Sequence, residues 1–138
     1  VSLEYALQYY GMIPERVEAV TSVTTGRSKR FGTPVGLFIY RQIPVPAFRI
    51  GMTRVERDDK TAFLIAVPEK ALADKVRDDR GTGIQSRSRM VSYLLDNLRI
   101  DESALRGLDP DLLAGIGDRF QSRKIRLLSE TIRKWDGS

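Results

Sequence analysis

The hydrophobic positions near the start of the chain change from helical to alternating spacing. Residues 3–10 carry apolar side chains at i, i+3, i+4 and i+7, which predicts a helix capped by Ser2 and ended at Gly11. Pro14 prevents the helix from continuing. A rise in β-branched residues then predicts a strand over residues 17–24.

Strand patterns continue as far as residue 66. Residues 29–32 and 35–43 predict a hairpin, because Pro and Gly at positions 33–36 separate two apolar stretches. Residues 50–57 and 61–66 predict a second hairpin around the three-residue loop 58–60. Together these segments indicate one mostly antiparallel sheet of four to five strands.

Helical spacing replaces the strand pattern from Pro68 onwards. Pro68 at the first helical position and Glu69 in the first turn predict a helix to about Asp78. A polar loop with two glycines precedes a second helix, whose apolar stripe runs from residue 90 to residue 98. Later signals are helix starts at Asp101 and Asp109, a break at Gly115 and Gly117, and a long last helix with one apolar face from Phe120 to Trp135.

This order of elements defines an α+β fold class, in which an N-terminal helix and an antiparallel sheet are followed by an all-helical segment. We expect residues 1–80 to form an α+β core. Residues 81–138 either pack on this core as helices or form a small helical subdomain.

Composition removes most familiar kinds of active site. The 138 residues include no His and no Cys, so the common zinc ligands, the usual near-neutral general base and the thiol nucleophile are missing. The sequence therefore predicts neither a metal site nor a cofactor, and we expect a protein that is not an enzyme. An apolar run of about 20 residues, which a membrane span requires, does not occur, and we expect a cytoplasmic location.

Positive charge is concentrated in the strand region. Residues 21–57 contain seven Lys or Arg and one acidic residue, Glu56, whereas the chain as a whole has a net charge of +5. Such a surface favours phosphate or an acidic partner, although bases also solvate exposed hairpins and protect sheet edges. The candidate nucleic-acid or partner-binding residues are Arg27, Lys29, Arg30, Arg41 and Arg49.

A second, smaller basic cluster surrounds the glycine-containing loop that follows the first helix after the strands. It consists of Arg80, Arg87 and Arg89. The loop lacks the GxxxxGK[ST] string of a phosphate-binding loop and does not follow a strand, so a linker is the better interpretation. The helix start at residues 86–88 still offers a dipole that attracts anions.

Carboxylates and aromatic residues supply no further site. The acidic pairs at residues 58–59, 78–79 and 101–102 are sequence neighbours, which do not converge on one point, so we interpret them as turn and cap residues. Phe38 and Tyr40 share one face of a predicted strand, and Tyr10 lies on a helical stripe, which favours core packing over base stacking. Trp135 is interpreted as an anchor for the last helix.

Several segments in this order resemble the C-terminal domain of the AbiEi family of antitoxins. The resemblance covers roughly residues 1–78 and is strongest in the segments 2–15 and 68–74. It also includes the Thr-rich segment 20–25, the basic segment 26–31 and the apolar segment 36–40. The later helices are similar only in general character.

The resemblance implies an antitoxin of a bacterial toxin–antitoxin or abortive-infection system, involved in phage defence. Its partner would be a nucleotidyltransferase-like toxin, which such antitoxins need not neutralise through a stable complex. Family members carry an N-terminal winged helix-turn-helix that represses their own promoter, and we expect this sequence to correspond to the domain that follows it. A share in DNA binding and transcriptional regulation would then come from the positive surface.

Two other hypotheses remain open. One is a metal-dependent nucleic-acid enzyme of the nuclease type, which the sequence disfavours because Glu69 and Lys70 are adjacent rather than spaced as Glu-x-Lys and lie in a predicted helix. The other is an oligomerisation module whose apolar helix faces pack against a second copy.

Overall fold

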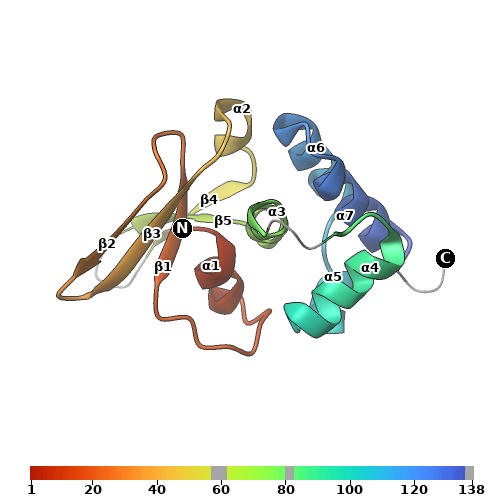
Figure 1. The fold of residues 1–138 in the computed structure, drawn as a ribbon, viewed down its shortest axis with the longest axis horizontal. Coiled ribbons are helices and arrows are strands. Elements are labelled where there is room, and N and C mark those ends of the chain that lie inside the picture. Colours follow the sequence, from red (N-terminus) through yellow and green to blue (C-terminus); the bar gives the residue numbers. More distant parts are fainter. Residues whose placement is uncertain (57–61, 80–82, 136–138) are drawn as a thin grey trace.

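The computed structural model describes residues 1–56, 62–79 and 83–135 of the chain (Figure 1). The first helix is α1 (Leu3–Tyr9), and the strands are β1 (Val20–Thr24), β2 (Lys29–Thr33), β3 (Gly36–Gln42), β4 (Met52–Glu56) and β5 (Ala62–Ala66). The short helix α2 (Val45–Phe48) lies between β3 and β4. The helices α3 (Pro68–Asp78), α4 (Arg87–Ser92), α5 (Glu102–Arg106), α6 (Pro110–Phe120) and α7 (Arg123–Arg133) follow, with a π-helical turn, η1 (Tyr93–Asn97), directly after α4. The predicted α+β class is confirmed.

The strands form two small sheets where the sequence predicted one. A three-stranded sheet has the order β1-β3-β2, and a two-stranded antiparallel sheet consists of β4 and β5. The antiparallel strand pairing of both predicted hairpins is confirmed, whereas the predicted loop 58–60 lies outside the described residues. β1 runs parallel to β3, so the first sheet is mixed. The sheets are separate because Pro44 and Pro46 start α2, which sequence reasoning missed and which turns the chain away after β3.

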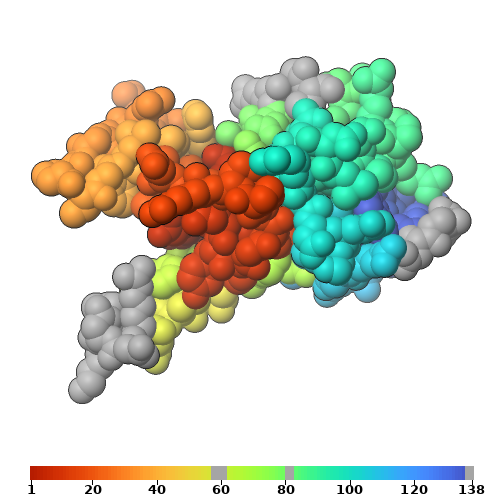
Figure 2. Space-filling view, turned by 90° about the horizontal axis from the view of Figure 1, so that it is seen from below, coloured from red at the N-terminus to blue at the C-terminus, as the bar shows by residue number. Residues whose placement is uncertain are grey.

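The loop between β1 and β2 crosses the end of β3. Its position is fixed by Gln42, whose backbone N–H donates to Ser28 Oγ at 2.8 Å and whose side chain donates to the carbonyl of Thr25 at 3.3 Å. This crossing places β2 on the far side of β3, at the outer edge of the sheet. The β2–β3 hairpin therefore projects from the body of the molecule (Figures 1 and 2).

Helix α3 lies at the centre of the fold. It has the predicted bounds. It contacts α1 and β5 from the N-terminal part of the chain and α6 and α7 from the C-terminal part. Its Ala71, Leu72, Ala73 and Val76 are fully buried and belong to one hydrophobic cluster that also includes residues of α1, β5, α6 and α7. The predicted division of the chain into a core of residues 1–80 and a helical segment of residues 81–138 stays a prediction.

A polar network at the end of α3 connects the same elements. Lys75 Nζ contacts Glu4 of α1 at 3.2 Å and Asp79 at 2.8 Å, and Asp79 also accepts a hydrogen bond from the hydroxyl of Tyr93. Burial opposes the charge of Lys75, but the hydrogen bonds and the two carboxylates outweigh it and raise its pKa. Burial and the bond to Asp79 raise the pKa of Tyr93 far above its usual value.

Three local predictions about helix ends are wrong. Ser2 does not cap α1; its hydroxyl instead donates to Asp74 Oδ2 at 2.6 Å. Gly115 and Gly117 lie inside α6 rather than at a break, and Gly117 is small because a Cβ there would lie 3.1 Å from Arg126 Cγ of α7. Phe120 ends α6, since Gln121 adopts a left-handed conformation (φ 53°) and Ser122 caps the shorter last helix, α7.

Candidate nucleic-acid and partner interface

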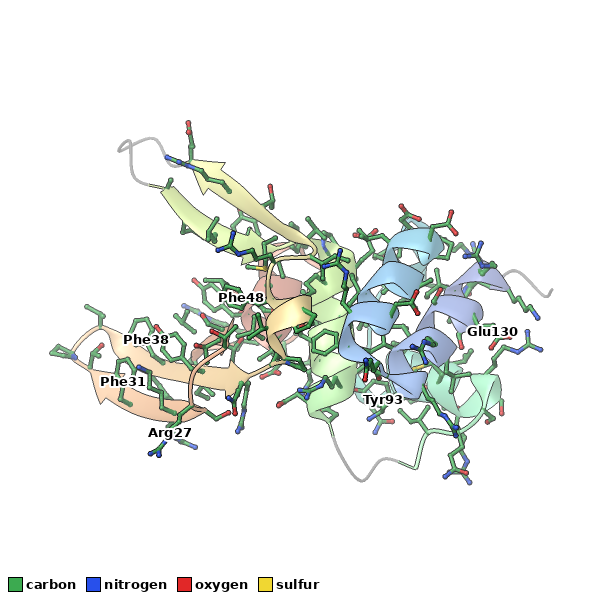
Figure 3. All side chains as sticks on the ribbon, turned by 90° about the horizontal axis from the view of Figure 1, so that it is seen from above. Arg27, Phe31, Phe38, Phe48, Tyr93 and Glu130 are labelled. Carbon is green, nitrogen blue, oxygen red and sulfur yellow. The ribbon has the colours of Figure 1, made fainter. Side chains whose placement is uncertain are left out.

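The basic candidates of the strand region lie on several elements. Arg27 is exposed in the loop between β1 and β2, and it points outward in Figure 3. Lys29 and Arg30 are exposed neighbours on β2, so their side chains lie on opposite faces of the sheet. Arg41 lies on β3, and Arg49 follows α2. The structure therefore distributes these basic residues over the hairpin and the segments next to it rather than gathering them in one patch.

The two faces of the β2–β3 hairpin differ in chemistry. Arg30 pairs with Ile39 across the hairpin, and the register places both on the same face as Arg41. Arg41 is half-exposed and lies 3.7 Å from Asp78 at the end of α3, which neutralises part of its charge. In the described part of the chain, by contrast, Arg27, Lys29 and Arg30 form no ion pair.

The opposite face of the hairpin carries aromatic rings. Phe31 lies opposite Phe38, with ring centroids 5.8 Å apart and ring planes 17° apart, and it stacks on Tyr40 at 5.9 Å and 13°. Figure 3 shows Phe31 and Phe38 side by side on the hairpin, away from the helices. Lys29 Nζ lies 5.2 Å from the Tyr40 ring centroid and 5.9 Å from that of Phe31. We call Lys29, Phe31, Phe38 and Tyr40 the aromatic face.

The core packing predicted for Phe38 and Tyr40 is wrong. Neither ring belongs to the hydrophobic core of the described residues, nor packs against it, and Phe31 is 42% exposed. The alternating pattern correctly placed the two side chains on one face of a strand. It failed because the hairpin extends beyond the helices, so that this face meets solvent. The hairpin register is the signal that relates Phe31 to the other two rings.

The second basic cluster is only partly described. Arg80 lies outside the described residues, while Arg87 and Arg89 are exposed on α4. Ser86 caps this helix by accepting a hydrogen bond from the backbone N–H of Arg89 at 3.3 Å. Arg89 lines a surface pocket with Ile84, Ser92, Tyr93 and Asn97. Arg87 and Arg89 are two positions apart on one turn and therefore do not point to one site.

The acidic pairs act structurally wherever they are described. Asp78 contacts Arg41, Asp79 contacts Lys75 and Tyr93, and Asp101 accepts a hydrogen bond from Ser103. Asp58 and Asp59 lie outside the described residues. Over residues 1–56, 62–79 and 83–135, no group of three acidic side chains is placed to hold a metal ion.

Two oppositely charged side chains of α3, Lys70 and Asp74, are buried together. Lys70 Nζ donates to both carboxylate oxygens of Asp74 at 2.8 Å, and both side chains are fully buried. Burial lowers the pKa of Lys70 and raises that of Asp74, against the mutual attraction of the two charges. Ser2 completes the cluster through its hydrogen bond to Asp74. Because solvent does not reach these groups, we assign them to the scaffold.

The remaining aromatic candidates are also structural. The Tyr10 hydroxyl donates to the carbonyl of Ala66 at 2.8 Å, and Trp135 packs partly buried against the core while its indole N–H donates to Glu102 at 3.1 Å. Tyr9 is half-exposed and makes edge contacts with Tyr10 and Phe63. In none of the described helices is there an apolar segment long enough to cross a membrane.

Comparisons with protein families, with curated proteins and with solved structures find no match to this chain. The interface is therefore interpreted from its own geometry.

Proposed function

We propose that the chain is an antitoxin domain that neutralises a nucleotidyltransferase-like toxin of a bacterial toxin–antitoxin or abortive-infection system. One observation supports this proposal most directly. The two segments of strongest resemblance, 2–15 and 68–74, pack together as α1 against α3 and share the buried hydrogen bond between Ser2 and Asp74. Distant parts of the sequence that carry the resemblance thus belong to one structural unit.

The unit formed by these segments is a scaffold, so the exposed hairpin is the part available for recognition. Its unpaired bases favour an anionic partner, either the toxin or its substrate. Contacts of the same bases with duplex DNA would support repression of the promoter. In this proposal the domain acts by binding, in the cytoplasm, rather than by catalysis.

The test is rescue of growth when the full chain is co-expressed with a nucleotidyltransferase-like toxin from the same genome. We expect the unmodified chain to restore growth. The triple variant Arg27→Gln/Arg30→Gln/Arg41→Gln should lose rescue, because it removes two bases from the hairpin and one from the loop that precedes it. A matched variant, Arg123→Gln/Arg126→Gln/Arg133→Gln, removes three exposed bases from α7 and should rescue normally.

Failure of the unmodified chain to rescue growth would overturn the antitoxin proposal. Rescue by the hairpin variant at the level of the α7 variant would leave the domain an antitoxin but remove the hairpin bases from its mechanism. Equal expression and equal circular dichroism spectra of the two triple variants are required for either conclusion.

A further inference from the structure

The aromatic face is a partly exposed apolar surface, in which Phe31 is exposed and Phe38 and Tyr40 are half-buried. Phe31, at 42% exposure, contacts two further rings of the neighbouring strand β3, and the described core does not contact these rings. Rings on a projecting hairpin contribute little to the core, and an apolar cluster that is open to solvent is typical of an interaction surface. The face lies on the projecting hairpin seen in Figures 1 and 2.

The surrounding charge identifies the kind of partner. Residues 19–55 contain no Asp or Glu, and their bases include Arg27 and Lys29, which have no carboxylate partner among the described residues. Lys29 Nζ stands beside the rings of Tyr40 and Phe31. A partner that meets this face is therefore both negatively charged and able to contact aromatic rings.

Single-stranded nucleic acid meets both conditions. Its unpaired bases present flat faces that stack on Phe and Tyr, and its phosphates pair with neighbouring Lys and Arg. A duplex hides the base faces inside its own stack, so it cannot use the rings. A second copy of this chain would bring two equally cationic faces together, which like-charge repulsion disfavours.

We propose that the aromatic face binds single-stranded nucleic acid, with bases stacked on Phe31, Phe38 and Tyr40 and phosphates bound by Lys29 and Arg27. This binding goes beyond neutralisation of a toxin and is independent of it. The face is also distinct from the side of the hairpin that presents Arg30 and Arg41.

The test is fluorescence anisotropy of the full chain with labelled oligo(U) and oligo(dT) of about ten nucleotides, a length that small sheet-based binding folds cover. A DNA duplex of the same length serves as the comparison. We expect binding of the single strands in preference to the duplex. The RNA and DNA probes together show whether the 2′-hydroxyl contributes.

Variants of the rings separate stacking from charge. Phe31→Leu and Tyr40→Leu each keep an apolar side chain but remove one aromatic ring, and each should weaken binding by about 5- to 100-fold. Phe31→Tyr keeps a ring and should bind normally. Lys29→Gln should lower the slope of log K against log salt by about 0.7, as expected for one lost phosphate contact with a single strand.

Two matched controls lie outside the face. Tyr9→Leu removes another half-exposed ring, and Arg123→Gln removes another exposed base, so neither should change affinity by more than about twofold. Trp135 fluorescence and circular dichroism establish that each variant is folded. If one leucine variant does not fold, the other leucine variant and Lys29→Gln still decide the question through affinity and salt slope.

Three results would overturn the proposal: no binding of either single strand, equal binding of single strand and duplex, or ring variants that bind as tightly as the Tyr9→Leu control. Self-association that the ring variants abolish, without oligonucleotide binding, would assign the face to a second copy. Failure of growth rescue alone would leave this proposal intact, because the oligonucleotide assay needs no toxin.

Discussion

The buried pair of Lys70 and Asp74 gives a quantitative prediction about stability. Both side chains have 0% exposure, and Lys70 Nζ contacts both carboxylate oxygens at 2.8 Å. Replacing Lys70 by Met preserves most of the apolar stem but removes the ammonium group. The carboxylate of Asp74 is then buried with Ser2 as its remaining hydrogen-bond donor among the described side chains.

The expected cost of Lys70→Met is about 3–5 kcal/mol, the usual penalty for leaving one member of a buried ion pair without the other. This is a large part of the roughly 5–15 kcal/mol by which a domain of this kind is stable. With a urea m-value of about 2 kcal/mol per M, the unfolding midpoint should fall by roughly 2 M. Urea unfolding followed by circular dichroism measures this shift directly.

Removing the whole polar cluster should cost far less than removing one charge. The triple variant Ser2→Ala/Lys70→Met/Asp74→Leu leaves none of the cluster's three polar side chains behind, so we expect it to unfold at or above the midpoint of the unmodified chain. Lys134→Met is the matched control, because Lys134 pairs with Glu130 at the same i, i+4 spacing but on the surface. It should change stability by less than about 0.5 kcal/mol. A loss of less than about 1 kcal/mol in Lys70→Met would refute the reasoning.

Two further predictions concern the backbone and a surface ion pair. Gly51→Ala should destabilise the fold by about 2 kcal/mol or more in thermal unfolding, because Gly51 has a φ of +76° and a Cβ there would lie 2.6 Å from Lys70 Cβ. Gly32→Ala is the control, because a Cβ at that position meets no atom within 4 Å. It should cost about 1 kcal/mol or less in the same measurement. The pKa of Glu15 is lowered chiefly by its hydrogen bond from Arg99, so its stabilising effect is present above the unfolded pKa and lost as pH falls through the folded pKa. NMR titration should show the pKa of Glu15 returning to its usual range in Arg99→Gln, and an unchanged titration would contradict the assignment.

The sequence predicted those elements whose signals are local. Pro68 and Glu69 defined the start of α3, and the turn residues at 33–36 defined the β2–β3 hairpin. The parallel pairing of β1 with β3 could not be predicted, because it depends on the loop crossing held by Gln42, a contact between residues far apart in sequence. Likewise, serine is a preferred N-cap residue, but the hydroxyl of Ser2 donates its hydrogen bond to Asp74, which is distant in sequence, instead of capping α1.

The candidate interface shows the same limit. Net charge identified the region correctly as basic, yet it could not distinguish Lys29 beside the rings from Arg30 on the opposite face. Phe38 and Tyr40 followed the alternation of a buried strand, and only the projection of the hairpin shows that nothing in the described core covers them. A periodicity reports which side chains share a face, whereas the position of the element decides whether that face is buried.

The central position of α3 also determines which parts of the molecule can unfold locally. Because α3 contacts α1 and β5 on one side and α6 and α7 on the other, both sides lose buried area when it detaches. Its backbone amides should therefore exchange with deuterium only through global unfolding, whereas those of the projecting β2–β3 hairpin should exchange through small local openings. The hairpin that carries the candidate interface is thus free to fluctuate without loosening the helix that keeps the chain folded.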